Sequence, residues 1–146
     1  MIIPSARASL HALNKAAEAA GLPRALAELL NLRASQINGC AVCLDMHSRA
    51  LVKLGESTER INCVAAWRET PYFSDAERAA LALTEALTRI ADRPDAVPDD
   101  IWNEAARHYD ETVLAAIVLS IATINVWNRL NTATRQVSGP WVADFI

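Results

Sequence analysis

Apolar residues recur along most of the chain at intervals of three and four, which is the spacing of one face of an α-helix. Leu26, Leu29, Leu30 and Ile37 show this pattern clearly and would face a core from a helix that begins near Pro23. No segment shows the sustained alternation with hairpin turns that is typical of strands. We therefore expect seven helices, over residues 5–20, 23–38, 40–54, 57–67, 74–91, a short one from residue 99 or 100, and 110–135.

Capping residues support the ends of these helices. Ser5 and Asp110 are expected to cap the first and the last helix, and Ser74 with Glu77 three residues later forms a capping box. Gly21 suits the position just after the first helix. Beyond the last helix, Ser138-Gly139-Pro140 is a stop, and Trp141, Phe145 and Ile146 are expected to form a tail that docks on a neighbouring element.

Composition favours the same fold class. The 146 residues include 28 alanines, whereas aromatic residues reach only 5%. Alanine is the strongest helix former, and aromatic and β-branched residues are what sheets favour. With 52% hydrophobic residues, no linker and no repeat, we expect one all-α domain over residues 1–146, built as a bundle of six to seven helices.

The charge and the apolar segments exclude several classes of partner. A formal net charge of −3 without a Lys/Arg cluster argues against nucleic acid, because binding there requires neutralised phosphates. The most apolar segment, residues 113–126, is shorter than the roughly 20 residues that a bilayer requires, so we expect a core helix and no membrane partner. Residues 1–21 lack a continuous apolar run and the chain has three cysteines, so the expected location is the reducing cytoplasm.

The segment over residues 36–47 contains the candidate reactive residues. On a helix, Cys40, Cys43 and His47 project within a sector of about 60°. The helix would begin near Asn38-Gly39, so its unpaired N–H groups and positive dipole end would lower the pKa of a nearby thiol. A Cys-x-x-Cys pair can close to a disulfide, and His47 can exchange protons with a thiol. We therefore favour redox chemistry.

Other cysteine sites fit less well. Haem attachment needs a His directly after the second cysteine, where Leu44 stands, and a thioredoxin domain needs strands. A zinc site would obtain three ligands from Cys40, Cys43 and His47 and lacks a fourth from a second cluster. Cys63 is expected to be a buried, inert thiol.

Two sets of residues resemble the alkylhydroperoxidase AhpD family of the carboxymuconolactone decarboxylase superfamily. The first is Glu28, the run over residues 35–40, Cys43 and His47, and the second is the segment over residues 121–130. The resemblance covers roughly residues 25–135. It implies an all-helical homo-oligomer, often a trimer or hexamer, with cysteine-based peroxidase activity and no required metal, haem or flavin.

The resemblance also implies roles for four residues. Cys43 would attack the hydroperoxide and become a sulfenic acid, Cys40 would supply a proton and then close the disulfide, and His47 with Glu28 would relay protons. An unidentified dithiol or thiol-protein would reopen the disulfide. The chain departs from AhpD at Val42, where AhpD has a His. The implied proton relay therefore has one residue fewer than in AhpD.

Reasoning from the residues alone leaves the nucleophile open. The helix dipole favours Cys40 as the thiol with the lower pKa, whereas the position of His47 favours Cys43. Glu28 lies on the preceding helix and reaches His47 only if that helix packs antiparallel to the next. We place the peroxide in a pocket between the second, third and last helices. A decarboxylase-type lyase, a non-catalytic thiol sensor and a zinc-binding scaffold are the alternatives.

Overall fold

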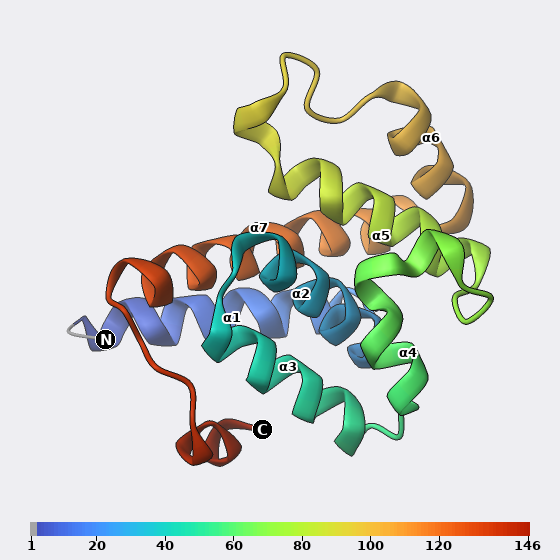
Figure 1. Ribbon diagram of the computed structural model, residues 1–146. Coiled ribbons are helices and arrows are strands. Elements are labelled where there is room, and N and C mark those ends of the chain that lie inside the picture. The colour runs from blue at the N-terminus through green and yellow to red at the C-terminus, as the bar shows by residue number, and fades with distance from the viewer. Residues whose placement is uncertain (1–2) are drawn as a thin grey trace.

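The computed structural model of the protein describes residues 3–146, apart from the side chains of Pro4 and Asp92. This part of the chain contains helices and no strand, which confirms the expected all-α fold (Figure 1). The predicted domain includes Met1 and Ile2, which lie outside the described residues. The α-helices are α1 (Pro4–Ala19), α2 (Arg24–Asn38), α3 (Ala41–Lys53), α4 (Thr58–Cys63), α5 (Asp75–Thr88), α6 (Asp99–His108) and α7 (Glu111–Ala133), and the 3-10 helices are η1 (Val64–Glu69), η2 (Ile90–Asp92) and η3 (Pro140–Phe145).

Helices α2 and α7 form the centre of the bundle. Helix α7 packs against α1, α2 and α5, and α2 also packs against α3 and α5. In Figure 1, α5 and α6 lie above this central pair and α3 lies below it. Leu30 of α2 and Ile117 of α7 are fully buried in the main hydrophobic core, as the spacing of apolar residues predicts.

The capping signals place three of the four helix ends correctly. Ser74 and Glu77 form both halves of the capping box at α5, and the carboxylate of Asp110 accepts hydrogen bonds from two backbone N–H groups in the first turn of α7. Ser5 is not a cap, and that prediction is wrong. Helix α1 begins one residue earlier, at Pro4, because proline tolerates the first turn, where its missing N–H costs nothing.

Three helices end at least two residues earlier than predicted. The helix expected over residues 74–91 ends at Thr88 and is followed by the separate 3-10 helix η2. The helix expected over residues 57–67 is α-helical only to Cys63 and continues as η1, with a kink at Ala66. The last helix stops at Ala133, because Arg135 adopts a left-handed conformation with φ 53°. That conformation lets the Gln136 N–H donate to the Asn131 carbonyl at 2.9 Å, which closes the end of α7.

Helix α7 extends on both sides of its most apolar segment, residues 113–126, which alone is shorter than a bilayer requires. With 23 residues it is long and apolar enough to cross a membrane by length and composition alone. Half of its most apolar window is buried inside the fold, and its buried Ser120, Asn125 and Asn128 side chains form hydrogen bonds within the bundle. It serves here as the central core helix.

The C-terminal tail folds back against α3. Val142 is fully buried in a small hydrophobic cluster with Val42 and both Cys40 and Cys43, and Ile146 packs against the same cluster. The Lys53 ammonium donates to the Ile146 carbonyl oxygen at 2.9 Å. The tail therefore docks as expected, although Val142 rather than an aromatic side chain is its buried anchor.

A buried carboxylate joins three elements of the bundle. Glu85 of α5 accepts hydrogen bonds from Arg33 of α2 at 2.8 Å, Trp67 of η1 at 3.0 Å and Arg68 of η1 at 2.7 Å. Burial by itself raises the pKa of Glu85, and the donors Arg68, Trp67 and Arg33 outweigh it, so the pKa is lowered. The carboxylate is thus charged at neutral pH.

Replacing Glu85→Ala should lower the free energy of unfolding by about 3 kcal/mol, because it leaves the buried Arg33 guanidinium without its partner. Since the pKa of Glu85 is lowered in the folded state, its contribution is present at neutral pH and is lost as the pH falls through that pKa. Urea denaturation at pH 7 and at pH 4 measures both effects. The matched control is Glu104→Ala, which removes an exposed carboxylate on α6. Equal losses in the two variants would contradict the assignment.

Candidate redox site

The turn between α2 and α3 positions both cysteines. Gly39 ends α2 in the left-handed region with φ 66°, a conformation that glycine adopts without strain. Cys40 follows in an extended conformation as the N-cap residue of α3, and Cys43 is the third residue of the helix. The predicted helix included Cys40, whereas Cys40 lies directly before the first residue of α3. The two cysteine side chains are nevertheless in contact.

The two thiols are in contact. Their Sγ atoms lie 3.0 Å apart, and both residues are only 3% exposed. Neither cysteine is in a disulfide, so both sulfurs are reduced. Since a disulfide bond is about 2.05 Å long, closing it requires the sulfur atoms to approach by about 1 Å. A three-residue spacing across a helix start thus suffices to make a disulfide within reach.

One proton and one negative charge are shared between the two sulfurs. The Cys43 thiol as hydrogen-bond donor, together with the Cys43 backbone N–H and the amides of Asn131 and Asn128, lowers the pKa of Cys40 to about 6 despite its burial. The same contact, with burial and the charge on Cys40, raises the pKa of Cys43. These opposite shifts make Cys40 the more acidic of the two thiols, in agreement with the argument from the helix end.

Asparagines of α7 complete the surroundings of the thiols. The Asn131 amide lies with Nδ2 at 3.3 Å from Cys43 Sγ and donates to it. Asn128 donates to Ser35 Oγ at 3.0 Å and accepts from Asn38 Nδ2 at 2.8 Å. Asn128 lies inside the segment over residues 121–130 that carries the resemblance, whereas Asn131 lies one residue beyond it and was missed. The available signal was a polar residue at every third position, 125, 128 and 131, of an otherwise apolar helix.

Glu28 and His47 form a second pair. The His47 ring nitrogen Nδ1 lies 2.6 Å from Glu28 Oε2, and both side chains are mostly buried. This contact confirms that α2 and α3 pack so that the carboxylate of one reaches the imidazole of the other. The carboxylate fixes the orientation of the ring and the tautomer at Nδ1. It leaves Nε2 as the nitrogen for exchanging protons.

The structure brings the four predicted residues together as two pairs. Within residues 3–146, no hydrogen bond joins His47 directly to either thiol. In the same part of the chain, no three His, Cys, Asp or Glu side chains lie close enough together to hold a metal ion. The zinc site considered from Cys40, Cys43 and His47 is therefore not assembled by the described residues.

The other singled-out residues have local contacts. Cys63 is half-buried, so the prediction of a buried thiol is wrong, because it lies at the short junction between α4 and η1. His11 stacks against Trp127 with ring centroids 5.5 Å apart. Exposed His108 contacts Glu104 at 3.2 Å, and Asp45 forms an ion pair with Arg49 on the surface.

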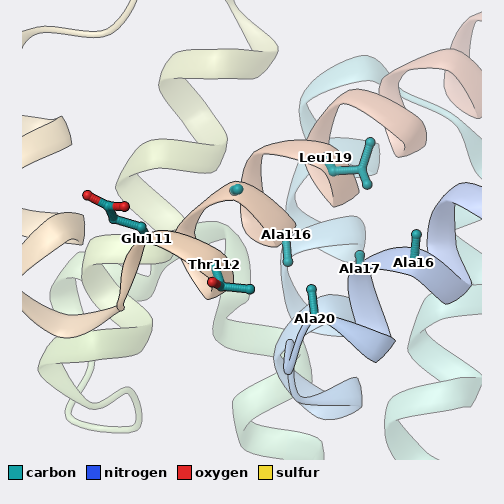
Figure 2. A pocket seen from close by; sticks show the side chains of 8 residues that line it. Ala16, Ala17, Ala20, Glu111, Thr112, Ala116 and Leu119 are labelled. Atoms are coloured by element: carbon teal, nitrogen blue, oxygen red, sulfur yellow. The ribbon is translucent and has the colours of Figure 1, made fainter.

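Two open grooves lie on the surface away from the thiols. One, of about 430 Å³, runs between α1 and α7 and is lined mainly by alanines, among them Ala16, Ala20 and Ala116 (Figure 2). The other, of about 440 Å³, lies between α2, α3 and α4. Neither groove is lined by a cysteine, His47 or Glu28, so neither is the peroxide pocket that was expected between α2, α3 and α7.

Comparisons with known proteins relate this chain to one family. Residues 4–86 match the model of the carboxymuconolactone decarboxylase family. The uncharacterised protein YdfG of Bacillus subtilis is 39% identical over 132 residues, which cover 90% of this chain and 88% of YdfG. Both matches include the segment with the two cysteines.

Solved structures show the same fold. A protein of unknown function from Agrobacterium tumefaciens, described as a candidate AhpD antioxidant defence protein, superposes with a TM-score of 0.88 and 35% identity over 94% of this chain and 93% of that one. The debrominase Bmp8 is 22% identical and superposes with a TM-score of 0.82, over 97% of this chain and 75% of the Bmp8 chain. At that identity the second likeness concerns the fold alone.

The low pKa of Cys40 predicts one thiolate per chain at neutral pH. In a Cys63→Ser background, thiolate absorbance near 240 nm should rise by one equivalent with a midpoint at about pH 6. Cys43→Ala should move that midpoint to higher pH, because it removes the principal hydrogen-bond donor to the Cys40 sulfur. A midpoint that stays in place when Cys40 is replaced by Ala would assign the thiolate to the other sulfur.

Proposed function

The chain belongs to the carboxymuconolactone decarboxylase family, and we propose that it is a thiol peroxidase that reduces hydroperoxides with its Cys40–Cys43 pair. The observation that carries this proposal is the 3.0 Å contact between two reduced sulfurs at the start of a helix. The pKa of Cys40 is lowered to about 6, and its sulfur is close enough to Cys43 to close a disulfide with an oxidised Cys43. The AhpD resemblance of the same residues supports the substrate class.

In the first step Cys43 is the nucleophile. Its proton passes to the Cys40 thiolate across their short contact, and the Cys43 thiolate attacks the terminal oxygen of the hydroperoxide. The O–O bond breaks, an S–O bond forms, and Cys43 becomes a sulfenic acid. The alkoxide that leaves takes the proton from Cys40 and departs as the alcohol, which restores the Cys40 thiolate.

In the second step Cys40 closes the disulfide. Its thiolate attacks Cys43 Sγ, the S–S bond forms, and hydroxide leaves the sulfenic acid. Protonated His47 neutralises the hydroxide to water, so charge balances over both steps. An external dithiol or thiol-protein then reduces the disulfide, and His47 takes up the proton that the renewed pair releases.

Glu28 is a positioning residue in this scheme. Its carboxylate lies 2.6 Å from Nδ1 of His47 and so fixes the orientation of the ring that donates the proton in the second step. Since His47 makes no direct hydrogen bond to a thiol, a water molecule is the natural carrier between Nε2 and the leaving hydroxide. Val42, which is buried where AhpD has a His, adds no further proton donor.

We also place this activity in a homo-oligomer in a reducing cytoplasm. Apolar side chains stay 37–41% exposed on α1 and α7, at Leu13, Val126 and Leu130. Apolar surface of this kind favours association between subunits. A trimer or hexamer is the assembly that the AhpD resemblance implies.

A decarboxylase-type lyase is the second candidate, because the family name covers that chemistry. Such a reaction makes no use of two thiols at the start of a helix. Full turnover of a lactone substrate by a Cys40→Ser/Cys43→Ser double variant would establish it in place of the peroxidase.

One equivalent of hydrogen peroxide or cumene hydroperoxide should convert the reduced protein to a Cys40–Cys43 disulfide. In Cys40→Ser the same treatment should leave a sulfenic acid on Cys43, because the resolving thiol is gone. Peptide mapping by mass spectrometry, with dimedone to trap sulfenic acid, distinguishes the two products. Cys63→Ser is the matched control and should react like the wild type. Oxidation that stops on Cys40 in Cys43→Ser, with Cys43 inert in Cys40→Ser, would reverse the two roles.

Glu28→Gln should slow disulfide closure by about 10²-fold, which is the lower end of what a positioned acid–base group contributes. The amide keeps the shape of the side chain and removes the carboxylate charge that orients the His47 ring. Stopped-flow kinetics with excess peroxide separates this step from sulfenic acid formation, which should change less. The exposed Glu59→Gln on α4 is the control. Equal rates in the two variants would remove Glu28 from the mechanism.

A further inference from the structure

Asn131 is the amide of α7 that is directed at the redox pair. It lies in the last turn of the helix, half-buried, with its Nδ2 at 3.3 Å from Cys43 Sγ. Its backbone is held in place, because the Gln136 N–H donates to its carbonyl oxygen where the left-handed Arg135 closes the helix. The position of the amide is therefore set by the end of α7 and not by the thiols.

The two preceding asparagines on α7 donate to other side chains, although the Asn128 amide also contributes to lowering the pKa of both thiols. Asn125 donates to Thr88 Oγ1 and to the Ile121 carbonyl, and Asn128 donates to Ser35 Oγ. These two amides join α7 to α5 and α2. Asn131 differs from them because its amide donates to a reacting atom.

The direction of this hydrogen bond matters for the choice of nucleophile. At rest the charge lies on Cys40, which faces the backbone N–H of Cys43 at the helix start. For Cys43 to attack, the charge must move onto a buried sulfur. Burial opposes this move, whereas a hydrogen bond donated to the sulfur favours it.

We propose that Asn131 is a catalytic residue that stabilises the Cys43 thiolate through its Nδ2 donor and so makes Cys43, and not Cys40, the attacking sulfur. The inference deepens the proposed function and rests on it for its catalytic meaning. The step moves one proton from Cys43 Sγ to Cys40 Sγ. No bond to Asn131 is made or broken, and its N–H···S contact strengthens as the charge arrives.

The test isolates Cys43 as the single thiol in a Cys40→Ser/Cys63→Ser background. The rate of alkylation of Cys43 by iodoacetamide is followed against pH, which measures its thiolate without peroxide. Asn131→Ala should raise the midpoint and lower the rate at pH 7 at least tenfold. Asn131→Asp, which keeps the shape and adds a negative charge beside the sulfur, should lower the rate further than Ala does.

The order of the variants separates an electrostatic from a structural role. If Asn131 served only packing, the isosteric Asp would be milder than Ala. The exposed Asn103→Ala on α6 is the control and should leave the pH profile unchanged. A profile for Asn131→Ala that coincides with that of Asn103→Ala would overturn the proposal, as would a milder effect of Asp than of Ala.

The same proteins are then treated with hydrogen peroxide, and sulfenic acid on Cys43 is timed with dimedone. We expect the rates to fall in the order wild-type Asn131, Ala, Asp. If alkylation follows this order while peroxide leaves every variant unoxidised, the donor role of Asn131 stands and the peroxidase proposal fails. If peroxide oxidises all three equally fast, the assignment of Asn131 as a catalytic residue fails and the peroxidase proposal stands.

Discussion

The side-chain amide of Asn38 is the interaction on which the arrangement of the thiols depends. It donates to Asn125 and Asn128 of α7 at 3.0 and 2.8 Å, and so fixes the last residue of α2 against the central helix. The left-handed Gly39 and the N-cap Cys40 follow directly, so the direction of α3 is set from this point. Because the accepting amides of Asn125 and Asn128 are buried, these hydrogen bonds make the contact rigid. A proton shared over 3.0 Å between two sulfurs requires such rigidity.

Features that depend on residues close together in the sequence could be predicted from the sequence. The capping box at Ser74 and the cap at Asp110 mark helix starts because their side chains bond within one turn. The contact of Cys40 with Cys43 follows from a short spacing across a helix start. The contact between Glu28 and His47 could be predicted only by assuming that α2 and α3 pack antiparallel. The short turn at Gly39 favours that packing.

Features that depend on tertiary packing could not be predicted from such local patterns. Asn131 lies 88 positions after Cys43 in the chain, and its amide points at the sulfur only because α7 crosses the start of α3. The last turn of α7 ends on an Arg in a left-handed conformation, which sequence patterns reserve for glycine or asparagine. In the tail, aromatic residues were the expected anchors, yet the smaller Val142 fits the space beside the cysteines.

The docked tail has a practical consequence for handling the protein. Ile146 lies against the cluster that contains both sulfurs, and its carbonyl is bonded to Lys53. A polar substitution of Val142 or Ile146 would weaken this contact and change the apolar surroundings of the thiols. Redox measurements on such a variant would report the altered packing as well as the thiol chemistry, so a protein with an unaltered tail is the proper reference.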